Sequence, residues 1–123
     1  WEITNDLFFG ASDVTAYANW VNNCLARRAV GYKVVTFSVL PRANGGTPVT
    51  FEASRQNLNG RMRQNWRAYA DAFVDVGGDP RIGYAGAEFD NNWYDGSLVH
   101  LNTAGFLLVA QMAQNAFNGR VWP

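Results

Sequence analysis

The stretch from residue 34 to residue 40, Val-Val-Thr-Phe-Ser-Val-Leu, constrains the fold of this chain more than any other. It is rich in β-branched residues and almost continuously apolar, and Pro41 follows it directly. Such a run predicts a strand that is buried on both faces, as strands are in the centre of a parallel sheet. Because parallel strands need long crossover connections, we expect helices on either side of it and an α/β fold.

Helices are predicted before and after this strand. In the first, Ser12 or Asp13 can serve as the N-cap and Gly31 can end the helix. Its expected apolar face consists of Val14, Tyr17, Ala18, Val21, Cys24 and Leu25. The second extends roughly from Glu52 to Ala72, and its apolar face consists of Leu58, Met62, Trp66, Tyr69 and Phe73. The opposite face, which we expect to be solvated, carries Arg55, Asn59, Arg63 and Arg67.

Two shorter apolar runs predict further strands. Residues 7–9, Leu-Phe-Phe, are followed by Gly10, and residues 73–76 are followed by two glycines. Together with the helix that follows it, the first run would form a βαβ unit with a right-handed crossover to the strand at 34–40. Residues 79–93 show no clear period, so we expect a surface loop there.

The C-terminal part of the sequence predicts a helix that starts directly after the only histidine, His100. Asn102 or Thr103 can be its N-cap. The expected apolar face consists of Phe106, Leu107, Ala110, Ala113 and Phe117. A histidine on a loop before a packed helix is held in a fixed direction, as a general base must be.

The composition limits the partners and the class of protein. A chain of 123 residues forms one domain at most. Its net charge is zero without a basic run, which argues against a nucleic-acid partner, and no apolar run is long enough for a membrane span. Cys24 is the only cysteine, so an internal disulfide is excluded and cysteine usage indicates no compartment. Five Trp and eight Phe in a chain that begins at Trp1 rather than Met predict a processed product or fragment with a missing companion.

Three predicted loops carry polar groups to one edge of the expected sheet: residues 10–13, residues 41–42, and the loop with Asp95 and His100. Because the carboxyl ends of parallel strands share an edge, this edge is the expected site. An acid, an imidazole, hydroxyls and backbone amides suit acyl transfer, in which histidine takes a hydroxyl proton and donors hold an oxyanion. One histidine and one cysteine do not make a metal-ligand set, and no phosphate loop is present, so we expect no metal or other cofactor.

Four segments, in this order, resemble the SGNH (GDSL-like) hydrolases, a family of esterases and lipases with a flavodoxin-like three-layer sandwich. They are Asp-Leu-Phe-Phe-Gly-x-Ser-Asp (6–13), Val-Val-Thr-Phe-Ser-Val-Leu-Pro-Arg (34–42), Phe-Glu-x-x-Arg-x-x-x-Asn (51–59), and Asp-Gly with His-Leu-Asn-x-x-Gly (95–105). The resemblance implies that residues 1–123 are a single SGNH-like domain, the C-terminal part of the family's fold, with a short and incomplete parallel sheet. The block that bears the family's nucleophilic serine normally lies upstream, and nothing before Gly10 matches it.

The resemblance implies a role for individual residues. His100 matches the family's catalytic base, and Asp95 matches the acid that orients it. Gly10 and Ser12 match the oxyanion loop, with Ser12 at the position of an asparagine that donates to the oxyanion. Asp95 and His100 are further apart in sequence than in the family, which leaves Asp90 open as a substitute acid.

Three explanations stay open for the nucleophile. The chain is the C-terminal part of an esterase whose nucleophile lies on an N-terminal segment or companion chain; it is a degenerate domain retained for carbohydrate or protein binding; or Ser12 is itself the nucleophile, at a strand-to-helix turn. The first implies hydrolysis of a carboxylic ester with a small acyl group, for which a carbohydrate is one candidate alcohol. The second is motivated by Trp93 and Tyr94 beside the site, because exposed aromatic faces suit sugar rings.

Overall fold

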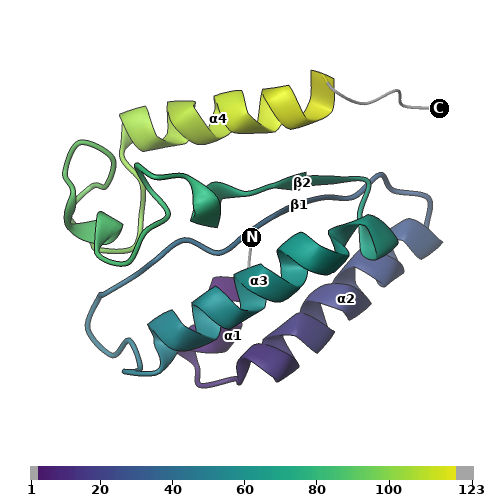
Figure 1. Ribbon diagram of the computed structural model, residues 1–123, viewed down its shortest axis with the longest axis horizontal. Coiled ribbons are helices and arrows are strands. Elements are labelled where there is room, and N and C mark those ends of the chain that lie inside the picture. The colour runs from purple at the N-terminus through teal and green to yellow at the C-terminus, as the bar shows by residue number, and fades with distance from the viewer. Residues whose placement is uncertain (1–2, 119–123) are drawn as a thin grey trace.

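The computed structural model describes residues 3–118, which form helices packed around a two-stranded parallel sheet (Figure 1). In chain order the elements are α1 (Ile3–Phe8), α2 (Asp13–Ala29), β1 (Val35–Phe37), α3 (Phe51–Tyr69), β2 (Ala72–Val74), the 3-10 helices η1 (Val76–Gly78) and η2 (Ala87–Phe89), and α4 (Thr103–Asn118). Helix α3 connects β1 to β2, and the strands pair with Val35 opposite Ala72 and Phe37 opposite Val74. The predicted α/β class is confirmed.

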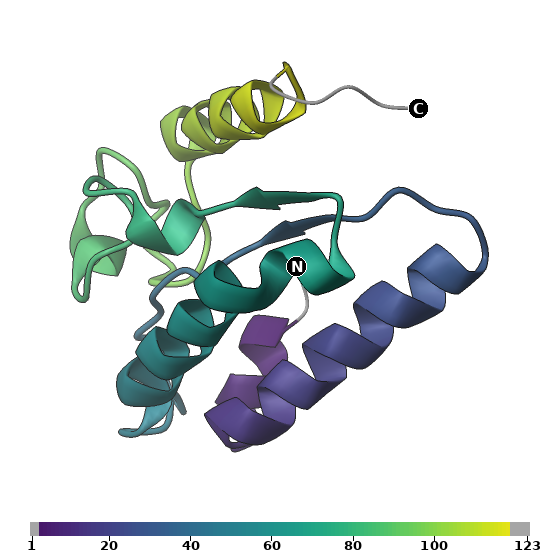
Figure 2. The ribbon, with the colours of Figure 1, turned by 45° about the vertical axis from the view of Figure 1, so that its right-hand side comes forward.

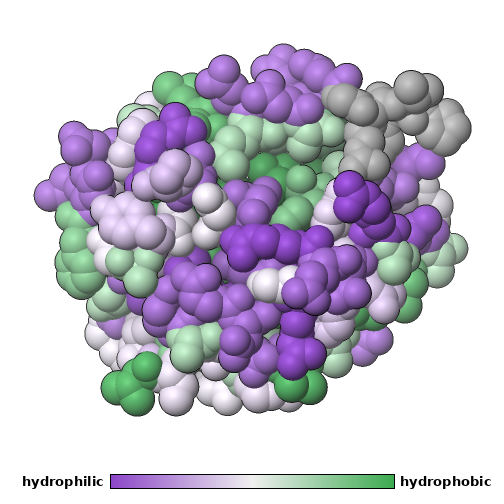
Figure 3. All heavy atoms as spheres, in the orientation of Figure 1, coloured by the Kyte–Doolittle hydropathy of each residue, from purple (hydrophilic) through white to green (hydrophobic). Residues whose placement is uncertain are grey.

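Helices lie on both sides of the strand pair (Figures 1 and 2). α4 packs on one side against β2, and α1, α2 and α3 pack together on the other side. One buried cluster joins these three helices to the end of β1, and a second joins the strands to α4 and to the segment before it. Hydrophilic residues cover much of the face in Figure 3, with a group of hydrophobic residues visible below α4 and others scattered around the rim. Within residues 3–118, no helix has both the length and the apolar character needed to cross a bilayer.

The two ends of α2 follow the local sequence signals. The Ser12 hydroxyl accepts from the backbone N–H of Thr15 at 3.1 Å, which confirms the predicted N-cap. At the other end, Gly31 has a φ of +88°, and the N–H of Tyr32 donates to the carbonyl of Arg27 at 3.1 Å. This glycine-dependent C-terminal motif ends the helix as predicted. The predicted apolar face is only partly correct, because Val14 and Leu25 are exposed whereas Ala16, Trp20 and Cys24 are buried.

The predicted strand at residues 7–9 is wrong, because residues 3–8 form α1. Leu7 is only 2% exposed, and Ile3, one helical turn earlier, packs against the same cluster. Phe9, by contrast, is 82% exposed, so the apolar run is not buried as a unit. Ile3 and Leu7 share one face of a helix, whereas Asn5, which would share that face in a strand, is exposed. The βαβ unit of this chain is therefore β1–α3–β2, not one that begins at residue 7.

The predicted solvated face of α3 is wrong for Arg55 and Asn59, which are fully buried, and correct for Arg67, which is exposed. The Asn59 side chain donates to the Val39 carbonyl at 2.8 Å and accepts from the Val39 N–H at 2.8 Å. Arg55 donates to the same carbonyl at 3.0 Å. Arg63 reaches across to Asp75, with its Nε 2.6 Å from a carboxylate oxygen. Buried backbone groups need partners, and α3 supplies those of Val39 just beyond β1.

α4 faces the core with a different side from the predicted one. Asn102 caps it, since its Oδ1 accepts from the N–H of Gly105 at 3.0 Å, and this part of the prediction is confirmed. Gly105 faces inward, where a Cβ would collide with the Trp93 carbonyl and the Leu101 side chain. This close approach brings Leu108 and Val109 into the core. Four of the five residues of the predicted apolar face are exposed: Phe106, Leu107, Ala110 and Phe117.

The segment between η1 and α4 is more deeply packed than the predicted surface loop. Ile82, Ala87 and Glu88 are buried, and the first two belong to the second cluster. The Glu88 carboxylate accepts from the N–H of Gly86 at 3.0 Å. Residues 79–93 thus bury apolar side chains although their sequence has no regular period, and the prediction of a surface loop is wrong for these buried residues.

Candidate functional site

His100 lies on a short closed loop that leads into α4. An isolated antiparallel bridge between Tyr94 and Leu101 joins the two ends of the loop. Just inside it, the N–H of Asp95 donates to the carbonyl of His100 at 3.0 Å. The His100 side chain is exposed although its backbone is fixed on both sides. The imidazole is thus accessible and held by a defined backbone, which a general base requires.

Ser97 organises the inside of this loop, and the sequence analysis did not identify it. Its hydroxyl oxygen lies 3.2 Å from Nδ1 of His100 and accepts from the N–H groups of Val99 at 3.3 Å and His100 at 3.1 Å. Its own N–H donates to Oδ1 of Asp95 at 2.8 Å. Among the described side-chain hydrogen bonds, none joins the Asp95 carboxylate to the His100 imidazole, and Ser97 lies between these two groups. The spacing Asp-x-Ser-x-x-His is the available signal, because serine and aspartate bond local backbone in turns.

The hydroxyl of Ser97, followed by its N–H group, holds the pKa of Asp95 below its usual value. His100 adds a smaller attraction that also lowers this pKa, against a desolvation effect that raises it. Asp95 is therefore a carboxylate at neutral pH. Asp90, the substitute acid, instead accepts from the N–H and the side-chain amide of Asn92 at 2.9 and 2.8 Å. Asp95 is the acid that the structure places on the His100 loop.

A pocket of about 390 Å³ opens beside His100. The segment that follows β1 forms its other side, and the two are joined by a hydrogen bond of 2.9 Å from the N–H of Ala43 to the carbonyl of Leu98. Its apolar lining consists of Leu40, Pro41, Val99, Leu101 and Phe106, and its remaining lining of Thr4, Asn5, Arg42, Asn44 and His100. The structure thus brings together two of the three predicted loops, residues 41–42 and the His100 loop.

The third predicted loop, residues 10–13, does not contribute to this pocket. Gly10 has a φ of +89° in the turn between α1 and α2, which lies on the side of the strands away from α4 (Figure 1). Ser12 is exposed, and its hydroxyl both caps α2 and lies 3.0 Å from the hydroxyl of Thr15. Neither Gly10 nor Ser12 is among the residues that line the pocket with His100. Their roles at an oxyanion, and that of Ser12 as a nucleophile, stay predictions.

Trp93 and Tyr94 do not form the exposed aromatic surface that motivated a sugar-binding interpretation. Tyr94 is 1% exposed, and its hydroxyl donates to the carbonyl of Ile82 at 2.7 Å. Burial raises the pKa of Tyr94 far above its usual value, so this residue is neutral. Trp93 is half-buried and packs against the second cluster. Both rings therefore pack beneath the His100 loop instead of forming an exposed surface.

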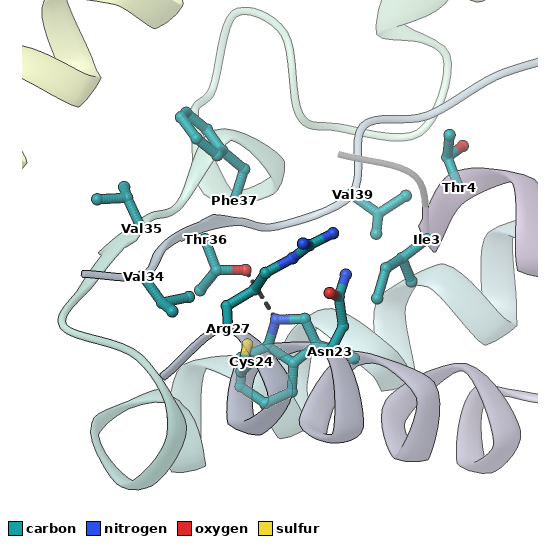
Figure 4. Close-up of a pocket in the computed structure, with 11 residues that line it drawn as sticks. Ile3, Thr4, Asn23, Cys24, Arg27, Val34, Val35, Thr36, Phe37 and Val39 are labelled. Carbon is teal, nitrogen blue, oxygen red and sulfur yellow. Dashed lines mark hydrogen bonds between the residues drawn. The ribbon is translucent and has the colours of Figure 1, made fainter. Parts of the chain in front are cut away.

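A smaller pocket, about 160 Å³, lies along β1 where α1 and α2 face it (Figure 4). The carbonyl of Val34 accepts from Ala72 at 3.2 Å, and the N–H of Ser38 donates to Val74 at 3.1 Å. Because backbone direction alternates along a strand, the backbone groups of Val35 face this pocket instead. Figure 4 shows α2 across the pocket, where the indole of Trp20 donates to the hydroxyl of Thr36 at 2.7 Å. Within residues 3–118, no strand pairs with this edge of β1, so the edge is open at Val35 in the part of the chain that the structure describes.

Comparison with known proteins gives no match, whether to a family model, to a curated protein or to a solved structure. Within residues 3–118, no group of three or more His, Cys, Asp or Glu residues is arranged to hold a metal ion. The functional interpretation therefore depends on the chain's own residues and on the pocket beside His100.

Proposed function

We propose that this chain is part of an SGNH-type serine esterase that hydrolyses a carboxylic ester with a small acyl group. The observation that carries the proposal is the accessible imidazole of His100, held on a closed loop at a pocket that the segment after β1 completes. In this mechanism His100 takes the proton of a serine hydroxyl as general base. It then returns the proton to the leaving alcohol as general acid.

In this proposal Asp95 orients His100 through Ser97. The carboxylate fixes the Ser97 N–H, and the Ser97 hydroxyl contacts Nδ1 of the imidazole. Nε2 then remains for the serine nucleophile, as in other acid–histidine–serine arrangements. Ser97 is thus a positioning residue. The role of Gly10 and Ser12 as an oxyanion loop comes from the family resemblance alone, because neither residue lines the pocket. We further propose that the nucleophile belongs to a segment outside this chain.

The open edge of β1 supports such a companion segment. A parallel strand paired at Val35 would extend the sheet and complete a flavodoxin-like three-layer sandwich, with helices on both faces. Its carboxyl end would lie toward Pro41 and Arg42, because parallel strands end at the same edge. A serine placed just after that strand would therefore approach the pocket that contains His100.

The proposal is tested on the native protein together with everything that copurifies with it. Intact-mass analysis after reaction with a fluorophosphonate probe should find the label on a second polypeptide, and p-nitrophenyl acetate should be hydrolysed. His100→Gln should reduce this turnover by roughly 10²–10⁴-fold, since it removes the acid–base group. Gln64→Ala, on the exposed face of α3, is the control and should leave the rate unchanged. Unchanged turnover in His100→Gln, or a label on Ser12, would contradict the proposal.

A binding domain without catalysis, for a carbohydrate or a protein, is the second candidate. The observation that favours it is that neither serine nor cysteine is among the residues lining the pocket beside His100, while Ser12 is occupied as a helix cap. In that case a ligand of the pocket would bind His100→Gln as well as the unaltered protein, and the probe would label no polypeptide in the native sample.

A further inference from the structure

We propose that the pocket beside His100 binds the carboxylate of a small, otherwise apolar organic acid, and that Arg42 is the residue that binds it. Only one consequence of this inference rests on the proposed function. If the pocket is the esterase site, its substrate is an ester that also carries a free carboxylate.

Arg42 contributes a positive charge to the pocket without a matching negative charge. Its Nε–H donates to Oδ1 of Asn44 at 2.9 Å, and its NH1 donates to Oδ1 of Asn5 at 3.4 Å. The guanidinium carbon lies 4.0 Å from the centre of the Phe8 ring. Amide oxygens and an aromatic face carry only partial negative charge. In residues 3–118, no carboxylate forms an ion pair with Arg42.

Four other arginines differ from Arg42 in forming an ion pair with an Asp or Glu. They are Arg55, Arg61, Arg63 and Arg81. Arg42 is half-buried, and partial desolvation lowers its pKa. Removing a charge from water without a counter-ion costs free energy, which a bound anion would offset. The guanidinium N–H groups that Asn5 and Asn44 do not use are free for such an anion.

The chemistry of the pocket selects a carboxylate over a phosphate. A guanidinium matches the planar carboxylate with two parallel hydrogen bonds and neutralises its single charge. Within residues 3–118, Arg42 is the only lysine or arginine that lines this pocket, so a phosphate dianion would keep an excess negative charge in a half-buried site. The apolar lining, which includes Leu40, Val99 and Phe106, suits the hydrocarbon part of the ligand. A volume of about 390 Å³ is sufficient for a small molecule.

The test compares phenylacetate with phenylacetamide, a neutral molecule of the same shape, by NMR titration of the full ¹⁵N-labelled chain. Phenylacetate should shift the backbone signals of Val99 and Leu101 and the Nε–H signal of Arg42. The Kd of phenylacetate should be lower than that of phenylacetamide by roughly tenfold or more. The carboxylate forms a charge-assisted pair with Arg42, whereas the neutral amide does not. Arg42→Gln should weaken phenylacetate binding by a similar factor and leave phenylacetamide binding unchanged. Arg42→Lys should give an intermediate Kd for phenylacetate, since lysine keeps the positive charge but cannot donate the two parallel hydrogen bonds of a guanidinium.

Arg67→Gln is the matched control, because Arg67 lies over the Trp66 ring on the outside of α3 and does not line the pocket. It should not change either Kd. Equal affinities for the two ligands would overturn the proposal, as would an unchanged phenylacetate Kd in Arg42→Gln. Inorganic phosphate binding as tightly as phenylacetate would overturn the choice of carboxylate. Because these titrations need no turnover, Arg42-dependent binding without esterase activity would contradict the proposed function alone.

Discussion

Gly77, in η1, lies close against α3 and the segment that follows β1. Its N–H donates to the hydroxyl of Ser38 at 2.7 Å. A Cβ at this position would collide with the amide of Asn59 and lie 2.7 Å from the carbonyl oxygen of Val39. These are the groups that fix the chain just beyond β1. A methyl group at residue 77 must therefore displace the hydrogen bonds between Asn59 and Val39.

Gly77→Ala should lower the free energy of unfolding by about 1–3 kcal/mol, the usual cost of forcing a methyl group into a packed interior. Urea unfolding measures this change. Gly60→Ala is the control, because Gly60 lies within α3 and a Cβ there would have nothing within 4 Å. Alanine should stabilise that position by about 0.5–1 kcal/mol, because it favours the helix over the unfolded chain. A Gly77→Ala variant as stable as Gly60→Ala would show that the close contacts are not restrictive.

Residues whose roles depend on their near neighbours were predictable from sequence. Ser12 and Asn102 each cap a helix through an N–H three residues further along, and Gly31 ends α2 within one turn. The burial of Arg55 and Asn59 was not predictable in this way. Their shared partner, Val39, is 16 and 20 residues away in sequence, so only the fold brings them together. Ser97 is an intermediate case, because its contacts are local but depend on how the loop closes.

At the scale of elements, α3 both connects the two strands and fixes the wall of the pocket. Asn59 satisfies both backbone groups of Val39, and Arg55 adds a second donor to its carbonyl. The next residues, Leu40, Pro41 and Arg42, line the pocket beside His100. The position of this wall therefore depends on α3 as well as on the pairing of β1 with β2.

Asn59→Leu should lower the free energy of unfolding by about 1–3 kcal/mol, because the buried N–H of Val39 loses its acceptor. Asn65→Leu makes the same substitution on the same helix at an exposed position, and should change stability by no more than about 0.5 kcal/mol. Urea unfolding of the two variants gives the comparison. Amide exchange at Val39 should accelerate in the first variant only. Equal stability and equal exchange in both variants would show that Asn59 does not hold the wall.

The elements differ in how far their sequences determine them. Helices α2 and α3 and strand β1 have signals long enough to separate a helical period from a buried strand. The apolar run at residues 7–9 is too short for this, because three consecutive apolar residues fit either a strand or a helical turn. In α4, apolar residues occur on both sides, so periodicity does not choose the buried one. Gly105 determines which side of α4 is buried. The helix approaches the Trp93 carbonyl closely at this residue, where any side chain would collide.

At the scale of the whole molecule, the α/β class was predictable but the extent of the sheet was not. Val35 to Phe37 have the composition of a central strand, yet among residues 3–118 only β2 pairs with them. Each strand of a two-stranded sheet has one edge outside the ladder, and proteins usually cover or pair such edges. Large apolar side chains such as Phe9 and Leu107 are also exposed. Both features favour a companion for this chain, as in the proposed function.

The open edge gives a prediction that needs only the chain itself. The N–H of Val35 faces the pocket of about 160 Å³, whereas the N–H of Ser38 donates to the Val74 carbonyl at 3.1 Å and is the internal control. Hydrogen exchange at Val35 should be faster than at Ser38 by roughly two orders of magnitude, since an amide outside the ladder exchanges without the strands separating. Binding of a companion strand should slow Val35 to the rate of Ser38. Equal protection of the two amides in the chain alone would show that the edge is already covered, and a companion strand at β1 would then be ruled out.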